Sequence, residues 1–283
     1  METSMLAFLA APFVASLILT GIHAYLGVHV VERGVIFVDL SLAQIAALGA
    51  TIALLTPFSN GDPHSSYVYW ISLLFTFIGA AVFSTIRGHR ARIPQEAIIG
   101  ICYAVASAAA ILAMSKSTSE SEHLKDMLVG NILAVSWPEV GKTAMLYGAV
   151  GLFHFIFRKK FLAISIDPKA AAAQGISIRF WDFLFYASFG FVVTSSVSIA
   201  GVLLVFCYLI VPSVAAMLYA DTIGRRLAIG WTMGTVVSAL GVYFSLQLDL
   251  PTGATIVCTF GLALILMAIV RPLIVRTVTV GQV

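Results

Sequence analysis

The chain has few charged residues, and this scarcity excludes an ordinary soluble globular protein. Asp, Glu, Lys and Arg together make up 10% of the 283 residues, whereas 60% are hydrophobic. The mean hydropathy is +1.01, and all these values lie far outside the range of soluble domains. The net charge of +3 therefore gives no indication of nucleic-acid binding, and we attribute it to membrane topology.

Three further features are scarce or missing. The cysteines, Cys102, Cys207 and Cys258, lie inside apolar runs, so neither a disulfide framework nor a cysteine metal motif is indicated. The first four residues lack a cationic region, and the following apolar run continues to Val31 without a small-residue cleavage site. This predicts a retained first helix and not a signal peptide. The chain has no glycine-rich phosphate loop with its lysine, so we expect it not to be an enzyme that hydrolyses ATP.

Long apolar runs dominate what is present. A helix needs about 20 apolar residues to cross the hydrocarbon core of a bilayer. Nine runs have a suitable length: roughly 5–31, 35–56, 67–87, 94–114, 139–158, 180–199, 201–220, 227–247 and 252–271. They predict an all-α, polytopic membrane helix bundle of about eight or nine transmembrane helices, organised as a single membrane domain over residues 1–283.

The basic residues are divided unevenly between the gaps that separate these runs. Thirteen of the sixteen lie in alternating gaps: Arg33, Arg87, Arg90, Arg92, Arg158, Lys159, Lys160, Lys169, Arg179, Arg225, Arg226, Arg271 and Arg276. The intervening gaps hold Lys116, Lys125 and Lys142. Basic residues near span ends are retained on the cytoplasmic side. The pattern therefore predicts an N-terminus outside the cell and a C-terminus in the cytoplasm.

The segment before the fifth run is amphipathic but too short and too polar to cross. We predict that it forms an outer helix over about 123–137, which lies in the interface or dips partway into the membrane. A crossing here, offset by one missed elsewhere, stays open. Four potential metal ligands lie close together in this region: Glu120, Glu122, His123 and Asp126. They could guide cations, or they could form a solvated or partner-binding polar face.

A long cytoplasmic gap at 158–179 contains the sequence DPKAAAAQG at 167–175. Asp167 can cap a helix and Pro168 suits the first helical position. The alanines favour a helix, and Gly175 favours its end. The pattern predicts a short helix with small side chains, suited to a groove of a soluble partner. An ordinary connector stays an equal alternative at this point.

A second unusual place is the run that begins at Gly201, because the turn before it is nearly absent and Pro212 interrupts it. Proline removes a backbone hydrogen bond and kinks a helix. Such a kink could border a pathway, where the freed carbonyl faces protein or water. A simple packing kink is an equal alternative.

Six segments, in this order, resemble the permease subunit of bacterial ATP-binding-cassette importers for zinc, manganese and iron. They are VVERGVIFVDLSLAQIAALG (30–49), EAIIGICYAV (96–105), DMLVGNILAVSWPEV (126–140), DPKAAAAQGISI (167–178), SIAGVLLVFCYLIVPSVAAML (198–218) and LDLPTGATIV (248–257). The resemblance covers nearly the whole chain. It implies the helical fold shared with the vitamin B12 and siderophore permeases, and a location in the bacterial inner membrane.

The resemblance also implies partners. Two permease copies would form the pathway between them, two ATPase subunits would bind beneath, and an outer binding protein would deliver the substrate. The helix at about 167–178 would be the coupling helix; its expected coupling residues are Asp167, Pro168, Ala171, Gln174 and Gly175. ATP would bind the partner subunit, so we expect no cofactor on this chain, only the transported metal.

The sequence departs from the resemblance where the metal is expected. Family members typically carry an Asp and, four residues later, a His on the second span, a pair that suits Mn and Zn. An ungapped alignment from Arg33 to Gly49 places Leu40 and Gln44 at these positions. The arginine that often follows the kink proline is replaced by Met217. Because the usual pair is absent, a metal chelate or another small solute is an alternative substrate.

Other residues could rebuild a site, because spans 1 and 2 should form a hairpin. On this geometry His29 and Asp39 lie at a similar depth, and so do His23 and Gln44, nearer the membrane middle. An ionisable side chain inside a span indicates function by default. We therefore expect these four residues to line the substrate pathway, with His23 and Asp39 as candidate metal ligands. Histidines bonded to a neighbouring carbonyl would be the structural alternative.

Two other classes of function, a secondary transporter and an intramembrane enzyme, fit the sequence less well than an importer. A secondary transporter usually has ionisable residues in mid-span, whereas carboxylates here are nearly absent at that depth. An intramembrane metalloprotease needs a His-Glu-x-x-His arrangement or an equivalent, and the sequence has none. We therefore expect no catalytic residues.

Overall fold

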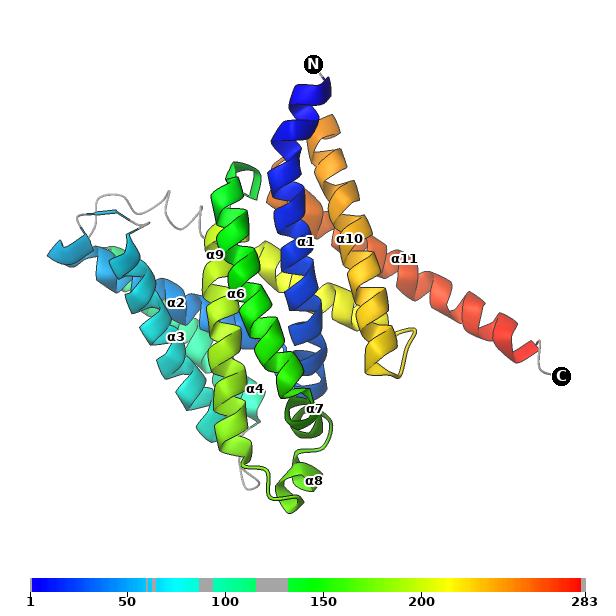
Figure 1. Cartoon of the computed structure of the whole chain (residues 1–283), viewed down its shortest axis with the longest axis horizontal. Helices are drawn as coiled ribbons and strands as arrows, with labels where there is room; N and C mark the ends of the chain where they lie inside the picture. The colour runs from blue at the N-terminus through cyan, green and yellow to red at the C-terminus, as the bar shows by residue number, and fades with distance from the viewer. Residues whose placement is uncertain (1, 60, 63–64, 87–93, 116–131, 281–283) are drawn as a thin grey trace. The chain divides into compact units, whose positions relative to one another are not determined.

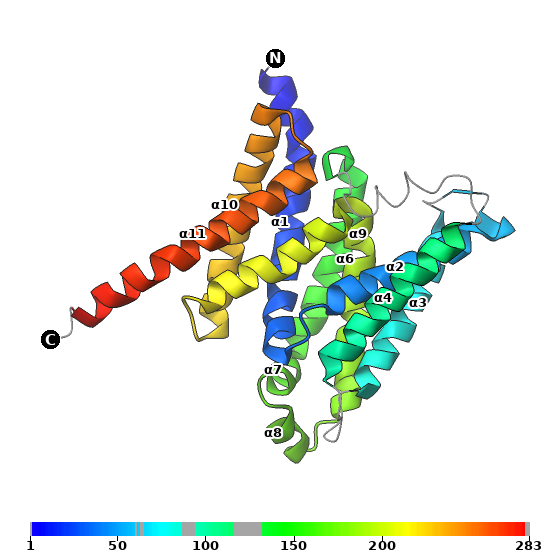
Figure 2. The ribbon, with the colours of Figure 1, turned by 180° about the vertical axis from the view of Figure 1, so that it is seen from behind.

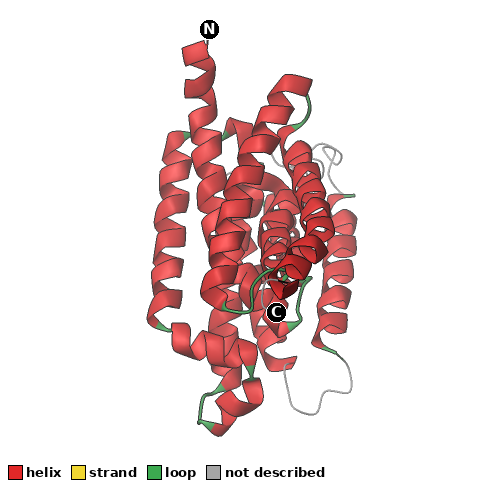
Figure 3. Cartoon of the chain, turned by 90° about the vertical axis from the view of Figure 1, so that its right-hand side faces the viewer, coloured by secondary structure: helices red, strands yellow, loops and turns green. Residues whose placement is uncertain are grey.

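The structure is a computed structural model of the chain, and it describes residues 2–59, 61–62, 65–86, 94–115 and 132–280. Within these residues the regular structure is helical, and Figure 3 shows helices joined by short loops with no strand among them. An all-helical chain satisfies its backbone hydrogen bonds internally, as lipid requires. The predicted all-α bundle is confirmed.

Six helices are long and apolar enough to cross a membrane, within the described part of the chain. They include α1 (Glu2–Arg33), α3 (Ser66–Ile86), α4 (Gln95–Met114), α9 (Ile178–Met217), α10 (Ile223–Leu248) and α11 (Thr252–Val280). A seventh is obtained if α6 (Trp137–Ile156) and α7 (Arg158–Ile166), which are bent by 74° at their junction, count as one broken span. The helix α2 (Val38–Leu54) is apolar but shorter.

These elements account for all nine apolar runs of the sequence. Two runs, 180–199 and 201–220, form the 40-residue element α9, which consists of two helices joined across a kink. The helix is interrupted at Gly201, whose φ of 75° and ψ of 160° are not helical. Only glycine adopts such angles at little cost. The near-absent turn that the sequence predicts before Gly201 is therefore the kink between these two helices.

The remaining described elements are short. They are η1 (Pro57–Ser59), η2 (Ile132–Ala134) and α8 (Pro168–Ala173). The outer helix predicted at about 123–137 lies mostly outside the described residues, and so do Glu120, Glu122, His123 and Asp126. Its described end contains η2 and the first residue of α6.

Contacts divide the chain into two compact units, each built from segments far apart in sequence. One unit comprises Met1–Val31, Asn131–Ala144 and Leu203–Val283; the other comprises Glu32–Gly130 and Met145–Val202. The helices α1, α6 and α9 each continue from one unit into the other. The single membrane domain over 1–283 stays a prediction.

In the first unit, small residues let helices approach closely. A Cβ on Gly27 of α1 would overlap the carbonyl oxygen of Leu209 in α9. Trp231 of α10 donates through Nε1 to the carbonyl oxygen of Gly21, at 3.0 Å. A Cβ on Gly241 of α10 would lie 2.8 Å from Cα of Ile256 in α11. Small interface residues of this kind are typical of helix packing in membranes.

In the second unit, α2 packs against both α3 and α4, and Figures 1 and 2 show the three helices side by side. A Cβ on Gly49 of α2 would lie 2.9 Å from Phe75 of α3. Ser72 of α3 donates to the carbonyl oxygen of Ala46, at 2.8 Å. At the start of α2, the backbone N–H of Phe37 donates to Oε1 of Glu96 in α4, at 2.9 Å. These contacts fix the start and the second half of α2.

Candidate functional site

The predicted short helix at 167–175 is present as α8 (Figure 1). Oδ1 of Asp167 accepts hydrogen bonds from the backbone N–H groups of Lys169 and Ala170, each at 3.0 Å. Pro168 occupies the first turn, where its missing N–H costs nothing. Gly175 has φ of +78°, so the left-handed residue that ends the helix is a glycine, as predicted. The local structure inferred from the sequence is confirmed.

The two faces of α8 differ. Ala171 is 1% exposed and holds the helix against the rest of the chain. The opposite face carries exposed small or polar residues: Lys169, Ala170, Ala172, Ala173 and Gln174. Because alanine ends at Cβ, this face allows another protein to approach the backbone closely. Ala171, which the sequence placed among the coupling residues, anchors the helix and is not on the open face.

The sequence did not predict the helix α7 that leads into α8. Residues 158–166 were expected to be part of a connector, yet they form a helix bent 74° away from α6. Phe161 and Ile164 of this helix are fully buried. The apolar residues that follow Arg158, Lys159 and Lys160 explain the helix, because they give it one buried side.

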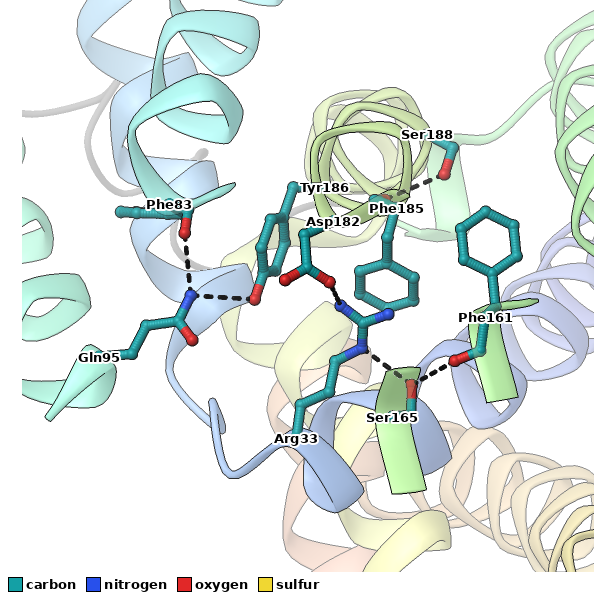
Figure 4. Close-up of polar contacts among 9 residues, drawn as sticks. All are labelled: Arg33, Phe83, Gln95, Phe161, Ser165, Asp182, Phe185, Tyr186 and Ser188. Atoms are coloured by element: carbon teal, nitrogen blue, oxygen red, sulfur yellow. Dashed lines mark hydrogen bonds and ion pairs between the residues drawn. The ribbon is translucent and has the colours of Figure 1, made fainter. Parts of the chain in front are cut away.

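A buried ion pair lies beside this segment, and Figure 4 shows it. Nη1 of Arg33, in the last turn of α1, lies 2.6 Å from Oδ1 of Asp182 in α9, and both side chains are fully buried. Nε of Arg33 donates to Oγ of Ser165 in α7, at 2.9 Å. The guanidinium carbon lies 3.9 Å from the ring centroid of Phe185, a cation–π distance. One cation therefore contacts two helices besides its own.

The polar contacts continue beyond the ion pair. Ser165 donates to the carbonyl oxygen of Phe161, at 2.9 Å. The hydroxyl of Tyr186, next to Phe185, accepts from Nε2 of Gln95 at 3.1 Å. The same nitrogen donates to the carbonyl oxygen of Phe83 in α3, at 3.0 Å. In the sequence, Arg33 indicated only membrane topology, and no pattern pointed to Asp182, Ser165 or Gln95 as functional residues.

The two histidines expected in the pathway lie in α1 and are buried. Nδ1 of His23 hydrogen-bonds the carbonyl oxygen of Leu19, at 2.8 Å. The ring of His29 meets that of Tyr25 edge-on, with centroids 4.8 Å apart. The bond from His23 to a carbonyl of its own helix is the structural arrangement that the sequence left open for such histidines.

Asp39 and Gln44 lie in α2. Asp39 is 2% exposed, and its Oδ1 has no hydrogen-bond partner within the described residues. Gln44 and Leu40 are half-buried. A buried carboxylate oxygen without a protein partner is a place that water or a cation can fill. Each predicted pair, His23 with Gln44 and His29 with Asp39, takes one residue from each unit. Both pairs stay predictions.

Three further observations concern Pro212, His154 and possible metal ligands. Pro212 lies inside α9, but the break that the structure records is at Gly201, eleven residues earlier. His154 of α6 hydrogen-bonds Oγ of Ser188 at 2.7 Å and stacks on Phe161 with centroids 4.4 Å apart. In the described ranges, no group of three or more His, Cys, Asp or Glu side chains could hold a metal ion.

Comparison with known sequences places these features in a family context. The family model described as "ABC 3 transport family" matches residues 5–271. The manganese transport system membrane protein MntC of Listeria innocua is 26% identical over 257 residues, which cover 88% of this chain and 86% of that protein. The chelated iron transport system membrane protein YfeC of Yersinia pestis is 25% identical, covering 86% of this chain and 79% of that protein.

Two solved structures share the fold. PsaBC from Streptococcus pneumoniae, in complex with a Fab, has a TM-score of 0.76 at 23% identity, covering 92% of this chain and 90% of that chain. An inward-facing putative metal-chelate type ABC transporter has a TM-score of 0.71 at 18% identity, covering 92% of this chain and 85% of that chain. The helical arrangement described above is therefore that of a known transporter architecture.

Proposed function

Because the chain belongs to the ABC 3 transport family, we propose that it is the membrane-spanning permease subunit of an ATP-binding-cassette importer for a divalent metal ion. The observation that carries this proposal is the family match over residues 5–271, nearly the whole length of the chain. Relatives named for manganese or iron transport, with most of each chain aligned, support the class of substrate. Manganese and iron are the first candidates, and zinc is the third.

In this role the chain moves the substrate and leaves ATP hydrolysis to a partner. Two ATPase subunits would bind beneath a pair of permease copies, each ATPase receiving one α8. The open face of α8, from Lys169 to Gln174, fits this task because its small side chains permit close docking. Asp167, Pro168 and Gly175 would fix the ends of the helix, and Ala171 would anchor it. A binding protein outside would deliver the metal.

The proposed topology places the N-terminus outside and the C-terminus in the cytoplasm of a bacterial inner membrane. Sequence charges put Arg33 and the segment 158–169 on the same side. The hydrogen bond from Arg33 to Ser165 supports this, because the end of α1 and the end of α7 meet within one unit. Both ends would face the ATPase subunits.

The proposed pathway is lined by His23, His29, Asp39 and Gln44. Asp39 is the strongest candidate for a metal ligand, because its buried Oδ1 has no partner among the described residues. His23 is the second candidate ligand. Pro212 would shape the second half of α9 beside the pathway. The neutral amide of Gln44 would offer a weak ligand or a hydrogen bond.

A metal chelate is the second candidate substrate. Leu40 and Gln44 favour a chelate, because they place an apolar side chain and a neutral amide where permeases of the resembled family typically carry Asp and His. A chelate brings its own ligands and requires mainly shape and neutral polar groups from the pathway. The substrate test below therefore includes both forms.

The complete complex, reconstituted in lipid vesicles, tests the proposal. ATPase activity and uptake would be measured with Mn, Fe and Zn, each free and chelated, and without metal. We expect one metal form to stimulate ATP hydrolysis and to accumulate inside only when ATP and the binding protein are present. Accumulation without ATP or partner subunits would instead indicate a secondary transporter and contradict the proposal.

A further inference from the structure

Arg33, Ser165 and Asp182 form a buried cluster, which we call the Arg33 joint. Arg33 donates through Nε to Ser165 at 2.9 Å and pairs through Nη1 with Asp182 at 2.6 Å. Phe185 covers the guanidinium plane (Figure 4). The rigid fork of a guanidinium fixes the direction of both partners, which a lysine ammonium would not do. The joint therefore sets how three helix ends lie relative to one another.

The two partners of Arg33 lie on either side of α8 in the sequence. Ser165 is two residues before Asp167, the N-cap of α8, and Asp182 is in the second turn of α9, seven residues after Gly175. The segment that enters α8 and the segment that leaves it are thus both bound to the side chain of Arg33. A displacement of α8 would be carried to Arg33 from both ends at once.

Arg33 is also connected to α2. The chain turns at Gly34, whose φ is +66°, and α2 begins four residues later at Val38. The N–H of Phe37 is bonded to Glu96 of α4, so this turn has little freedom of its own. A shift of Arg33 would therefore move the start of α2, the helix that carries Asp39 and Gln44.

Stability alone is a poor explanation for the joint. Burying an Arg–Asp pair loses the hydration of both ions, and apolar residues of similar volume often serve the fold equally well or better. This pair is fully buried, and Arg33 is also hydrogen-bonded to Ser165 of α7. These directional bonds fix the geometry of the site in a way that an apolar pair would not. They hold the ends of three helices to one side chain, that of Arg33.

We propose that the Arg33 joint is the positioning element that transmits motion of α8 to the end of α1 and the start of α2. This inference rests on the proposed function, because it takes α8 as the helix that the ATPase moves. The three residues need no contact with substrate or nucleotide. They act by keeping the α7–α8–α9 segment and the α1–α2 turn in a fixed relation.

The decisive variant is the double substitution Arg33→Met and Asp182→Leu in the full complex. It removes both charges together, so neither is left buried and unpaired, and it fills the site with apolar side chains. The control is Thr194→Val in the same helix α9, which removes a buried hydrogen bond to Thr76, at 3.1 Å, far along the helix from α8. Copurification of the ATPase shows that α8 still docks in each variant.

The readout is the ratio of ATPase activity with the metal-loaded binding protein to the basal activity, together with metal taken up per ATP. For the double variant we expect normal copurification, basal activity within twofold of the unmodified complex, and at least a fivefold loss of the ratio and of uptake per ATP. The control should keep both. A double variant that retains the ratio within twofold would overturn the inference.

If the double variant does not assemble, Arg33→Lys decides. Lysine keeps a cation for Asp182 but lacks Nε and its bond to Ser165, so we expect at least a threefold loss of the ratio; an unchanged ratio overturns the joint. The unmodified complex separates the two proposals. If no metal form stimulates it, the proposed function fails, whereas equal stimulation of variant and unmodified complex contradicts the joint alone.

Discussion

The backbone of Gly27 in α1 lies directly against the carbonyl oxygen of Leu209 in α9, with no room for a side chain between them. Ser213 adds hydrogen bonds at this crossing, since its Oγ donates to the carbonyl oxygens of Leu209, at 2.9 Å, and of Ala24, at 3.3 Å. Helices in a membrane gain no hydrophobic attraction from each other, so close packing and such hydrogen bonds must hold them together. The crossing is therefore sensitive to one methyl group.

The substitution Gly27→Ala tests this crossing. The added Cβ would overlap backbone atoms that cannot rotate away, so we expect a loss of about 1–3 kcal/mol of stability. The thermal unfolding midpoint in detergent should fall. Gly21→Ala in the same helix is the matched control, because no described atom outside its own stretch of helix lies within 4 Å of a Cβ placed there. Equal midpoints for the two variants would show that the crossing is looser than described.

The N-cap of α8 provides a second prediction. Asp167→Ala removes the acceptor of two backbone hydrogen bonds and should destabilise the short helix by about 0.5–2 kcal/mol. Because a six-residue helix is marginal without its cap, ATPase stimulation should fall several-fold while the membrane helices keep their unfolding midpoint. Asp167→Asn, which can still cap, should behave nearly as the unmodified protein. A defect of equal size in the asparagine variant would contradict a capping role.

A third prediction concerns Asp39. Asp39→Asn preserves the size of this buried side chain but removes its charge, so we expect metal uptake to fall by roughly tenfold, equivalent to about 1.4 kcal/mol. The unfolding midpoint should stay within a few degrees. Thr51→Val, also buried in α2 and bonded to its own helix through Ala47, should leave uptake unchanged. Full uptake by the asparagine variant would remove Asp39 from the pathway.

Much of the fold could be predicted from the sequence, because lipid imposes helix on any long apolar run. The caps of α8 could also be predicted from the sequence, because Asp167, Pro168 and Gly175 act on the backbone of only a few neighbouring residues. The break in α9 was visible as a near-absent turn between two predicted helical runs, and the structure places it at Gly201. The helix α7 was missed because its basic residues resembled a loop.

The Arg33 joint could not be predicted in the same way. Arg33 and Asp182 are 149 positions apart, and a pairing over such a distance depends on how three helices pack. Arg33 also had a sufficient explanation as a topology signal, which gave no reason to seek a partner for it. Asp182 follows closely after the basic residues of the cytoplasmic gap and could be taken as a solvated neighbour. The placement of His23 and Gln44 raises the same difficulty, since depth along a helix does not determine facing.

The open face of α8 consists largely of methyl groups, between Lys169 at one end and Gln174 at the other. Methyl groups determine the shape of a groove that can fit this face, but they offer no hydrogen bonds or charges for a partner to recognise. An ATPase from a related importer could therefore fit this permease if its groove has the same width. The selection of one ATPase among several in the same cell would then depend on the two polar ends of the helix, Lys169 and Gln174. Exchanging these two residues for those of a related permease should change which ATPase binds.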